Sequence, residues 1–509
     1  MARRRGTRAS RLRRSRLKQS AWQQVRNRLP PIEVLSADEV EHIHAGSLRI
    51  LRDIGMTIQN DEALDVLRRA GASVSRADCK VRFDPAHIEE VLPLLPAEFD
   101  VQARDPAKSL TVGGDRITFC STTGPAFASD LDRGRRPGTH EDMCDFIRIV
   151  HSLNIIHHEG GAGLEPLDLP ERTRYLDMMY AQCTLTDKTW HPCWKNSREK
   201  ARDIVEMSRI SLGASRSEVE RRPGVVTGIT TNSPLLLDGP IAEGLMELAR
   251  ANQPIGVAAF TMAGAMSPAT LAGALVQQNA EVLAGFMLIQ AVRPGCPVLY
   301  GNFATNVDLR SGAPAFGTPE HAKCAHAAGQ MARRYRVPFR SSNTTGSNAV
   351  DAQATYENAM SLWGTVMGHA NLLRHAGGWL EGGLTASFEK LIVDAEQLQA
   401  IAEYLRPIDI DESTLAIDVI AEVAPGGHFL DTKDTLDRYE NAFYEPMLSD
   451  WRTFEAWNED GARSATERAN AIWKQLLEGY QRPSMDPAIE DELTDYVARR
   501  KIAIVRDGK

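Results

Sequence analysis

Short apolar runs alternate with longer segments of helical period over the central half of the chain. Between the runs, apolar residues recur at helical spacing at 171–185, 200–212, 241–251, 268–291, 320–335 and 352–368. The eight runs lie at 117–120, 155–159, 189–193, 225–229, 255–259, 298–302, 337–341 and 372–375, and their starts are 30 to 43 residues apart. Strands that alternate with long helices predict parallel pairing through right-handed crossovers.

Eight strand–helix units predict a (β/α)8 TIM barrel over residues 115–388, within the α/β class. A doubly wound open sheet is the alternative. The barrel is favoured because no G-x-G-x-x-G or phosphate-binding loop follows a predicted strand. In the segment 352–368, Tyr356, Met360, Trp363 and Met367 recur at helical spacing, which predicts that they face the core.

Two flanking regions differ from the barrel pattern. Residues 29–114 predict an α/β lead-in, with helices at 37–54, 62–70 and 86–92 and a strand at 80–83. Ser36 and Glu39 have the spacing of a capping box at the start of the first helix. Residues 389–509 predict a helical extension packed on the barrel, with helices at 389–405, 415–423, 465–480 and 487–501. This extension could cap the barrel, form a dimer face or dock a partner.

Composition narrows the class of protein. The 509 residues are 43% hydrophobic and 25% charged, as in ordinary globular proteins, and no stretch approaches the ~20 apolar residues of a membrane span. The seven scattered cysteines and the lack of an apolar stretch after the arginine-rich start predict a cytoplasmic protein without membrane contact. Residues 1–28 carry ten Arg, one Lys and no acid, which predicts a disordered basic tail. Nucleic-acid binding is the less favoured alternative because the rest of the chain is acidic.

The familiar catalytic motifs are missing from the sequence. It contains no HExxH, G-x-S-x-G, Walker or zinc-finger spacing. His321, Cys324 and His326 do not share one helical face, and strand alternation sends His157 and His158 to opposite sides. We therefore predict no metal site in this chain.

The loops after the predicted strands are small and polar, at 121–124, 160–163, 230–233, 261–264, 304–306, 343–346 and 377–380. In a barrel these loops meet on the face that carries the chemistry. The last of them places His375, Trp379 and Glu381 in one glycine-rich stretch. Tryptophan is the best aromatic face for a cation, so this stretch is the strongest candidate site.

Other residues complete the set of candidates. Tyr300, Phe339 and Trp190 lie in predicted strands and could form an aromatic cage for a quaternary ammonium, or could simply pack in the core. Asn302 and Arg310 could hold a substrate carboxylate. Asp351, Gln353 and Glu357 follow the seventh loop, where Asp351 could equally cap a helix.

Several longer motifs, in the same order, resemble the trimethylamine:corrinoid methyltransferase superfamily over nearly the whole chain. They are Arg135-Arg136-Pro137 with Asp142, Gly301-Asn-Phe through Pro319-Glu320, Asp351-Ala-Gln-Ala with Glu357, Gly378-Trp-Leu-Glu-Gly-Gly through Glu389-Lys390, and Pro425-Gly-Gly-His-Phe-Leu430.

The resemblance implies a barrel whose mouth delivers a substrate methyl group to the cobalt of a separate corrinoid-binding protein. It implies no permanently bound cofactor, because the cobalamin is presented by that partner. Members that act on trimethylamine carry pyrrolysine, whereas residues 341–348, where it is expected, are all standard amino acids. The chain therefore resembles the pyrrolysine-free branch, some of whose members demethylate glycine betaine or related quaternary amines.

The chemistry of such a reaction agrees with the missing acid–base motifs. A quaternary nitrogen leaves as a neutral amine without protonation, so the protein mainly has to position the methyl group. Guided by the resemblance, we expect Glu381 and His375 to be catalytic and Trp379, Tyr300 and Phe339 to form the cage. The alternatives are another methylated amine and a non-catalytic betaine-binding protein. The expected partners are the small amine, the corrinoid protein and a second copy of the chain in a homo-oligomer.

Overall fold

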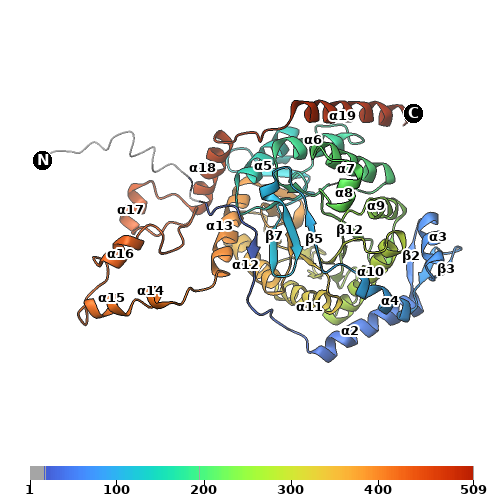
Figure 1. Ribbon diagram of the computed structural model, residues 1–509, viewed down its shortest axis with the longest axis horizontal. Helices are drawn as coiled ribbons and strands as arrows, with labels where there is room; N and C mark the ends of the chain where they lie inside the picture. Colours follow the sequence, from blue (N-terminus) through green and yellow to red (C-terminus); the bar gives the residue numbers. More distant parts are fainter. Residues whose placement is uncertain (1–16, 18, 194, 508–509) are drawn as a thin grey trace.

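The computed structural model describes residues 17, 19–193 and 195–507, so most of the predicted basic tail lies outside the described residues. The fold is a mixed α/β structure in which helices surround a core of mainly parallel strands (Figure 1). The end of the predicted tail is part of this core. Val25–Arg26 form β1, which pairs antiparallel with the strand Arg116–Phe119.

The central sheet contains six parallel strands in the order β7-β20-β19-β16-β14-β12. These strands are β7 (Arg116–Phe119), β12 (Thr227–Thr231), β14 (Ile255–Ala259), β16 (Val298–Asn302), β19 (Phe339–Ser342) and β20 (Leu372–Arg374). β10 (His158–Glu159) and β11 (Thr189–Trp190) pair parallel with each other. Parallel bridges join Cys120 to His158 and Trp190 to Val225. All eight predicted runs therefore contain a strand. Each run lies beside the next run along the chain, and the last run lies beside the first.

Helices follow these strands, and all but those at 140–152 and 216–221 were predicted from the periodicity. They are α5 (His140–Ser152), α6 (Arg174–Leu185), α7 (Arg198–Ser211), α8 (Arg216–Arg221), α9 (Gly239–Arg250), α10 (Leu271–Val292), α11 (Pro319–Tyr335), α12 (Ala352–Met367) and α13 (Phe388–Tyr404). Side chains at the N-caps accept hydrogen bonds from the first turn, for example Thr318 from the His321 N–H and Asp351 from the Ala354 N–H. These caps fix where α11 and α12 start.

The lead-in forms a small sheet at one side of the molecule (Figure 1). It contains β2 (Met56–Ile58), β3 (Ser73–Ser75), β4 (Lys80–Arg82) and β13 (Leu236–Leu237), with α2 (Ala37–Arg49), the π-helical turn η1 (Ile50–Ile54), α3 (Asp61–Arg69), α4 (Pro85–Val91) and the 3-10 turn η2 (Leu92–Leu94). Ser36 and Glu39 form the predicted capping box. β5 (Glu98–Val101) and β6 (Leu110–Gly113), separated by η3 (Pro106–Lys108), make a hairpin that covers the amino ends of the central strands.

A second layer of short strands lies at the carboxyl ends. The hairpin of β8 (Phe127–Asp130) and β9 (Gly134–Pro137) pairs with β22 (Thr385–Ser387) and β21 (Trp379–Leu380), which are joined by η4 (Glu381–Gly383). β15 (Met262–Ala263), β17 (Thr305–Val307) and β18 (Pro314–Ala315) form a further small sheet. These pieces were not predicted, because two- to four-residue strands leave little period in a sequence.

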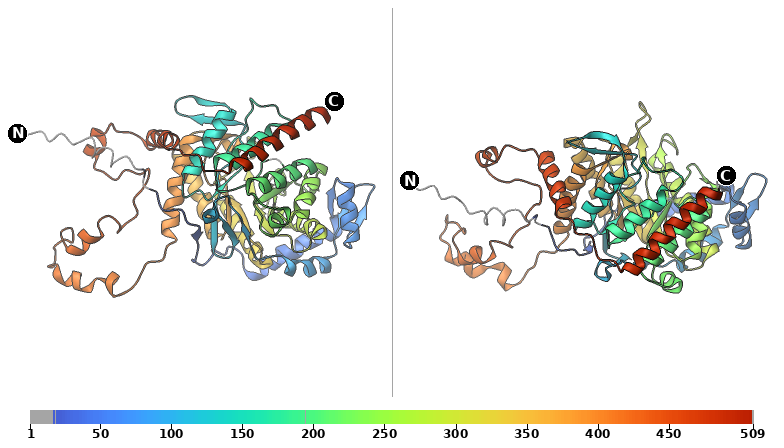
Figure 2. Two further views of the ribbon diagram at one scale, coloured as in Figure 1. Left: turned by 45° about the horizontal axis from the view of Figure 1, so that its top comes forward. Right: turned by 90° about the horizontal axis from the view of Figure 1, so that it is seen from above.

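The C-terminal region starts with α13, which packs against α18 (Ala465–Glu478). Between them the chain forms α14 (Glu412–Leu415), α15 (Ile417–Glu422), α16 (Lys433–Arg438) and α17 (Phe454–Glu459), and it ends in α19 (Pro487–Asp507) against α6 and α7. The views in Figure 2 show α14–α16 (orange) extending away from the rest of the molecule. Within the described residues, no helix has the length and apolar character needed to cross a membrane.

The predicted core-facing stripe of α12 is wrong for three of its four residues, and only Met367 packs against the core. Tyr356, Met360 and Trp363 are exposed, and the side of α12 that faces the core carries Ala354, Leu362 and Val366. The buried face consists largely of small residues because α11 approaches α12 closely, with the Gly364 Cα directly against Ala322. The large side chains were therefore placed outside, which periodicity alone does not reveal.

Candidate functional site

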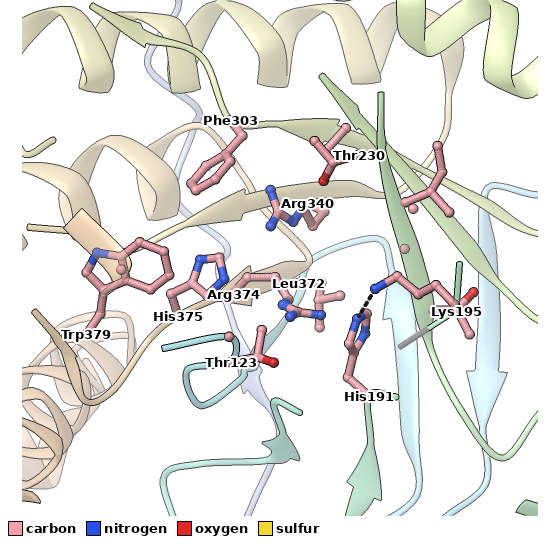
Figure 3. A pocket seen from close by; sticks show the side chains of 17 residues that line it. Thr123, His191, Lys195, Thr230, Phe303, Arg340, Leu372, Arg374, His375 and Trp379 are labelled. Atoms are coloured by element: carbon pink, nitrogen blue, oxygen red, sulfur yellow. Dashed lines mark hydrogen bonds between the residues drawn. The ribbon is translucent and has the colours of Figure 1, made fainter. Parts of the chain in front are cut away.

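A cavity of about 320 Å³ opens among the loops at the carboxyl ends of the parallel strands (Figure 3). Its walls come from segments that are far apart in the sequence, including Thr123 after β7, His191 after β11, Thr230 in β12, Phe303 after β16 and Arg374 in β20. A volume near 300 Å³ is at the small end of the range for ligand pockets. The cavity therefore suits a small molecule.

Three basic side chains line the cavity. Arg340 donates from Nη1 to the Asn302 carbonyl at 2.8 Å, and Arg374 donates from Nη2 to the Gly160 carbonyl at 3.2 Å. The Lys195 Nζ lies 3.1 Å from the His191 Nε2, as the dashed line in Figure 3 marks. The Nε of Arg374 is buried and has no hydrogen-bond partner. A buried donor of this kind is costly unless a ligand accepts its bond.

The cavity is electropositive. None of the described residues that line it is acidic. Burial and the nearby Arg374 lower the pKa of Lys195 to about 7, and the same two causes lower the pKa of Arg340 to about 9. Behind the wall, the Glu159 carboxylate accepts from the backbone N–H groups of Gly161 and Ala162, at 3.1 and 2.9 Å. Burial raises the Glu159 pKa. The Glu159 carboxyl group alone does not balance the three basic side chains of Lys195, Arg340 and Arg374. The cavity therefore favours a ligand that carries an anionic group.

Aromatic rings form the other side of the cavity. In Figure 3, Phe303, Trp379 and His375 lie together on the side away from Lys195. The ring centroids of His375 and Trp379 are 4.3 Å apart, and Phe303 lies 5.7 Å from His375 and 6.4 Å from Trp379. Behind them, Phe316 packs at 5.5 Å from Phe303 and 6.1 Å from Trp379. Burial and the neighbouring arginines hold the pKa of His375 well below its ordinary value, so its ring is neutral near pH 7. A neutral aromatic wall suits a cation or an apolar group.

The rim of the cavity depends on one glycine. Gly383 has φ 104°, and a Cβ atom there would lie 2.5 Å from the Trp379 ring. Only glycine therefore allows the indole to lie against the turn η4 at this position.

Of the residues predicted for the site, His375 and Trp379 line the cavity. Asn302 lies directly behind it, where its carbonyl accepts from Arg340. Glu357 supports a neighbouring loop, because its carboxylate accepts from the N–H groups of Gly346 and Ser347 at 2.9 and 3.2 Å.

Tyr300, Phe339 and Trp190 are buried in the large hydrophobic core and do not line the cavity. The Tyr300 hydroxyl donates to the Asn279 Oδ1 on α10 at 3.1 Å, so its ring points from β16 toward the surrounding helices. The register of β16 and β19 pairs Tyr300 with Phe339 and Gly301 with Arg340. Alternation along the strands therefore directs Arg340 to the cavity and its neighbour Phe339 to the opposite side.

The remaining predicted residues lie outside the cavity. Arg310 is in an exposed turn, where its backbone N–H donates to Asp308 at 3.1 Å. Asp351 caps α12, and the Gln353 side-chain amide donates to the Glu357 Oε1 at 2.8 Å.

Glu381 lies on the rim and forms an ion pair with Arg135 of β9. The Arg135 Nε is 2.9 Å from both carboxylate oxygens, and the guanidinium covers the Phe127 ring at 3.6 Å. This pair fastens the β8–β9 hairpin to η4. The predicted catalytic role of Glu381 thus has a concrete alternative, which is to position the rim.

The substitution Glu381→Gln distinguishes these roles. We expect it to lower kcat/KM by at most about 5-fold, since partly exposed ion pairs contribute ~0–1 kcal/mol. Steady-state rates of the variant and of Arg135→Gln should change alike. A loss of about 100-fold or more in the Glu381 variant alone would instead support direct contact with the substrate.

Sequence reasoning missed Lys195, Arg340, Arg374 and Phe303. The available signal was an arginine inside each of two predicted strands, at 337–341 and 372–375. A charged side chain in a buried strand requires a partner or a ligand. Among the described residues, no group of three or more His, Cys, Asp or Glu side chains is placed to hold a metal ion, and this includes His321, Cys324 and His326.

The comparisons with known proteins agree with the predicted resemblance. The family model for trimethylamine methyltransferase (MTTB) matches residues 2–505. The chain belongs to this methyltransferase family. The glycine betaine methyltransferase of Desulfitobacterium hafniense strain Y51 is 37% identical over 476 residues, which cover 93% of this chain and 98% of that protein.

More distant relatives are trimethylamine methyltransferases. MttB of Desulfitobacterium hafniense strain DSM 10664 / DCB-2 is 26% identical over 449 residues, covering 87% of this chain and 89% of the relative. MttB1 of Methanosarcina mazei is 27% identical over 484 residues, covering 92% and 94%. The predicted family is therefore confirmed.

Proposed function

We propose that this family member transfers a methyl group from a quaternary amine that also carries a carboxylate, such as glycine betaine, to the Co(I) of a corrinoid held by a separate protein. The observation that carries the proposal is that the cavity combines aromatic rings, at the end away from Lys195, with basic side chains, of which Arg340 lies over the Phe303 ring at 5.4 Å. A zwitterion with an onium group and a carboxylate complements both kinds of side chain at once. Trimethylammonium has no carboxylate, so it would face Lys195, Arg340 and Arg374 without compensation.

The relatives support the same substrate class. The relative named for glycine betaine is 37% identical, whereas those named for trimethylamine are 26–27% identical.

We also propose that the eight parallel strands close into a (β/α)8 barrel. The bridges from β7 to β10 and from β11 to β12 support closure, since they connect the two-stranded sheet to both edges of the six-stranded one. The cavity then lies at the mouth of the barrel, where TIM barrels carry their active sites.

In the proposed reaction the methyl C–N bond breaks and a Co–C bond forms, while the nitrogen keeps the electron pair of the broken bond. The product is a dimethylamino carboxylate, in which the amine is neutral and the carboxylate keeps its negative charge. The chain supplies orientation. Arg340 and Arg374 hold the carboxylate, and Trp379, Phe303 and His375 hold the onium group so that one methyl points outward. Fixing the reacting group in line with its nucleophile is a large part of the barrier reduction in such transfers.

The size of the cavity agrees with an external methyl acceptor. About 320 Å³ accommodates a small zwitterion but not a corrinoid ring, so the acceptor approaches the mouth from outside. The corrinoid-binding partner follows from the family resemblance. A cytoplasmic location stays a prediction from the sequence.

The test mixes the protein with a reduced corrinoid protein and follows methylation of cobalt by visible absorbance. We expect methylation with glycine betaine and at least ~100-fold lower kcat/KM with trimethylamine or choline, which lack the carboxylate. Faster transfer from trimethylamine would overturn the proposal. Glycine betaine binding in calorimetry without any cobalt methylation would favour the non-catalytic binding protein.

Lys195 should make substrate binding depend on pH. With a pKa of about 7, its amine is mostly charged at pH 6 and mostly neutral at pH 8, so attraction to the carboxylate weakens as the pH rises. We expect the Kd for glycine betaine, measured by calorimetry without a corrinoid protein, to rise about 3- to 10-fold between pH 6 and 8.5. In Lys195→Met this rise should disappear. Among the other groups, His191 and His375 are neutral throughout this interval, and Arg340, with a pKa of about 9, stays mostly charged and loses only part of its charge near pH 8.5.

A further inference from the structure

A buried carboxylate holds the glycine-rich loop between β20 and β21 from behind. Asp394 lies in the second turn of α13, and its Oδ2 accepts from the Gly378 N–H at 2.8 Å. The loop starts with His375 and ends with Trp379, whose rings line the cavity side by side (Figure 3). Asp394 is fully buried and does not line the cavity itself. It therefore influences the site through the backbone of the loop.

Three donors from three parts of the chain fix the orientation of this carboxylate. Besides the Gly378 N–H, the Lys390 ammonium in the first turn of α13 and the Asn358 side-chain amide of α12 donate to Asp394 Oδ1, the amide at 2.8 Å. The side chains of Lys390 and Asp394 are both 0% exposed. A carboxylate that accepts at both oxygens cannot turn without losing a hydrogen bond. The loop is thereby held in one position relative to α12 and α13.

The loop needs such a hold because two consecutive glycines, Gly377 and Gly378, directly precede Trp379. Glycine has the largest conformational freedom of all residues. Gly378 has φ 93°, and a Cβ atom there would lie 2.7 Å from the Phe146 ring of α5. Its carbonyl accepts from the Ser387 N–H at 2.9 Å. Together with Asp394, this bond satisfies both polar groups of a glycine that would otherwise act as a hinge.

The side chain of Trp379 does not anchor itself. Its Nε1 is buried and has no hydrogen-bond partner. The ring is held only by its packing, with centroids 4.3 Å from His375 and 6.1 Å from Phe316. The direction of the indole therefore depends on the backbone that carries it, and hence on the Gly378 peptide.

The ion pair is better explained by this hold than by stability. A fully buried ion pair contributes little to the stability of a fold, because taking both charges out of water is costly, and apolar residues often replace such a pair without loss. An apolar side chain at position 394, however, could not accept from the Gly378 N–H. We infer that Asp394 is a positioning residue for methyl transfer, which fixes the Gly378 peptide and thereby directs Trp379 toward the onium group. This inference rests on the proposed function.

Two double variants isolate the bond to Gly378. Lys390→Met/Asp394→Leu removes the ion pair together with the acceptor, whereas Lys390→Met/Asp394→Asn removes the charges but keeps one oxygen for the Gly378 N–H. If the Leu variant lacks the circular dichroism of the wild type, Lys390→Met/Asp394→Ala replaces it with the same expectations. The matched control, Asp203→Leu/Arg500→Met, removes another buried carboxylate and its arginine partner, 2.6 Å apart between α7 and α19 and outside the cavity lining.

Calorimetry compares glycine betaine with 3,3-dimethylbutyrate, which has the same shape and carboxylate but an uncharged carbon in place of the nitrogen. The wild type should bind glycine betaine at least ~10-fold more tightly, because only the cation gains from the indole face. In the Leu variant this preference should fall below about 3-fold, whereas the Asn variant and the control should stay within about 2-fold of the wild type. In a Trp379→Leu background, the Leu variant should change the Kd for glycine betaine by less than about 2-fold, since its effect acts through the indole.

Hydrogen exchange of residues 375–384 provides a readout that needs no ligand. We expect exchange at least ~10-fold faster in the Leu variant and close to the wild-type rate in the Asn variant. The inference would be overturned by wild-type exchange or an unchanged preference in the Leu variant, by an equal loss of preference in the Asn variant, or by the same loss in the control. A wild type that binds neither ligand would instead refute the proposed function, and the exchange rates would still show whether Asp394 holds the Gly378 peptide.

Discussion

Replacing Arg374 by methionine should lower kcat/KM for glycine betaine by about 100-fold or more. The Arg374 guanidinium is buried, and its Nε has no hydrogen-bond partner. It faces a cavity, and none of the described residues that line this cavity is acidic. Loss of one member of a buried charge pair costs ~2–5 kcal/mol, and each ~1.4 kcal/mol is a factor of ten. Most of the effect should appear in the Kd for substrate, measured by calorimetry.

Arg310→Met is the matched control, because it removes the same charge from an exposed turn outside the cavity. It should leave kcat/KM within about 2-fold of the wild type. Thermal unfolding of Arg374→Met checks the fold, and we expect no loss of Tm, since an incompletely paired buried cation does not stabilise the protein. A variant that binds glycine betaine as tightly as the wild type would show that the carboxylate lies elsewhere.

Much of the central fold could be predicted from the sequence. All eight predicted runs contain a strand. They could be recognised because parallel strands covered by helices are apolar on both sides, so their sequences interrupt the helical periodicity. Tyr356, Met360 and Trp363 of α12 were wrongly predicted to face the core, for a physical reason. Close packing of α11 and α12 requires small residues at their contact, so the large side chains of α12 face outward. Periodicity identifies a stripe but does not say which of two stripes is buried.

The site was only partly predictable. His375 and Trp379 were predicted correctly because both lie in one short glycine-rich loop after a strand, where several reactive or aromatic side chains follow one another closely. Arg340 was missed and Phe339 was chosen, although they are neighbours. The aromatic residue resembles a cage member, whereas strand alternation sends it to the core and Arg340 to the cavity. The side that a strand residue faces depends on the register of its strand with the neighbouring strands. The sequence of a single strand does not reveal that register.

Replacing Trp379 by leucine should weaken glycine betaine binding by about 30-fold. A desolvated cation–π contact contributes ~2 kcal/mol or more, and the indole forms the aromatic side of the cavity together with Phe303 and His375. Trp379→Phe keeps a smaller aromatic face and should lose only about 3- to 5-fold. Calorimetry measures both, and unchanged Tm values show that the rim around Gly383 is intact.

Two variants and two ligands together test the division of the cavity. Choline shares the onium group of glycine betaine but lacks its carboxylate. Trp379→Leu removes the contact that both ligands use, so it should weaken both by a similar factor. Arg374→Met should weaken glycine betaine alone and should even improve choline binding, because it removes a repelling charge. If Arg374→Met weakens choline as much as glycine betaine, the basic side does not recognise a carboxylate, and the selectivity against trimethylamine must arise from the shape of the aromatic side.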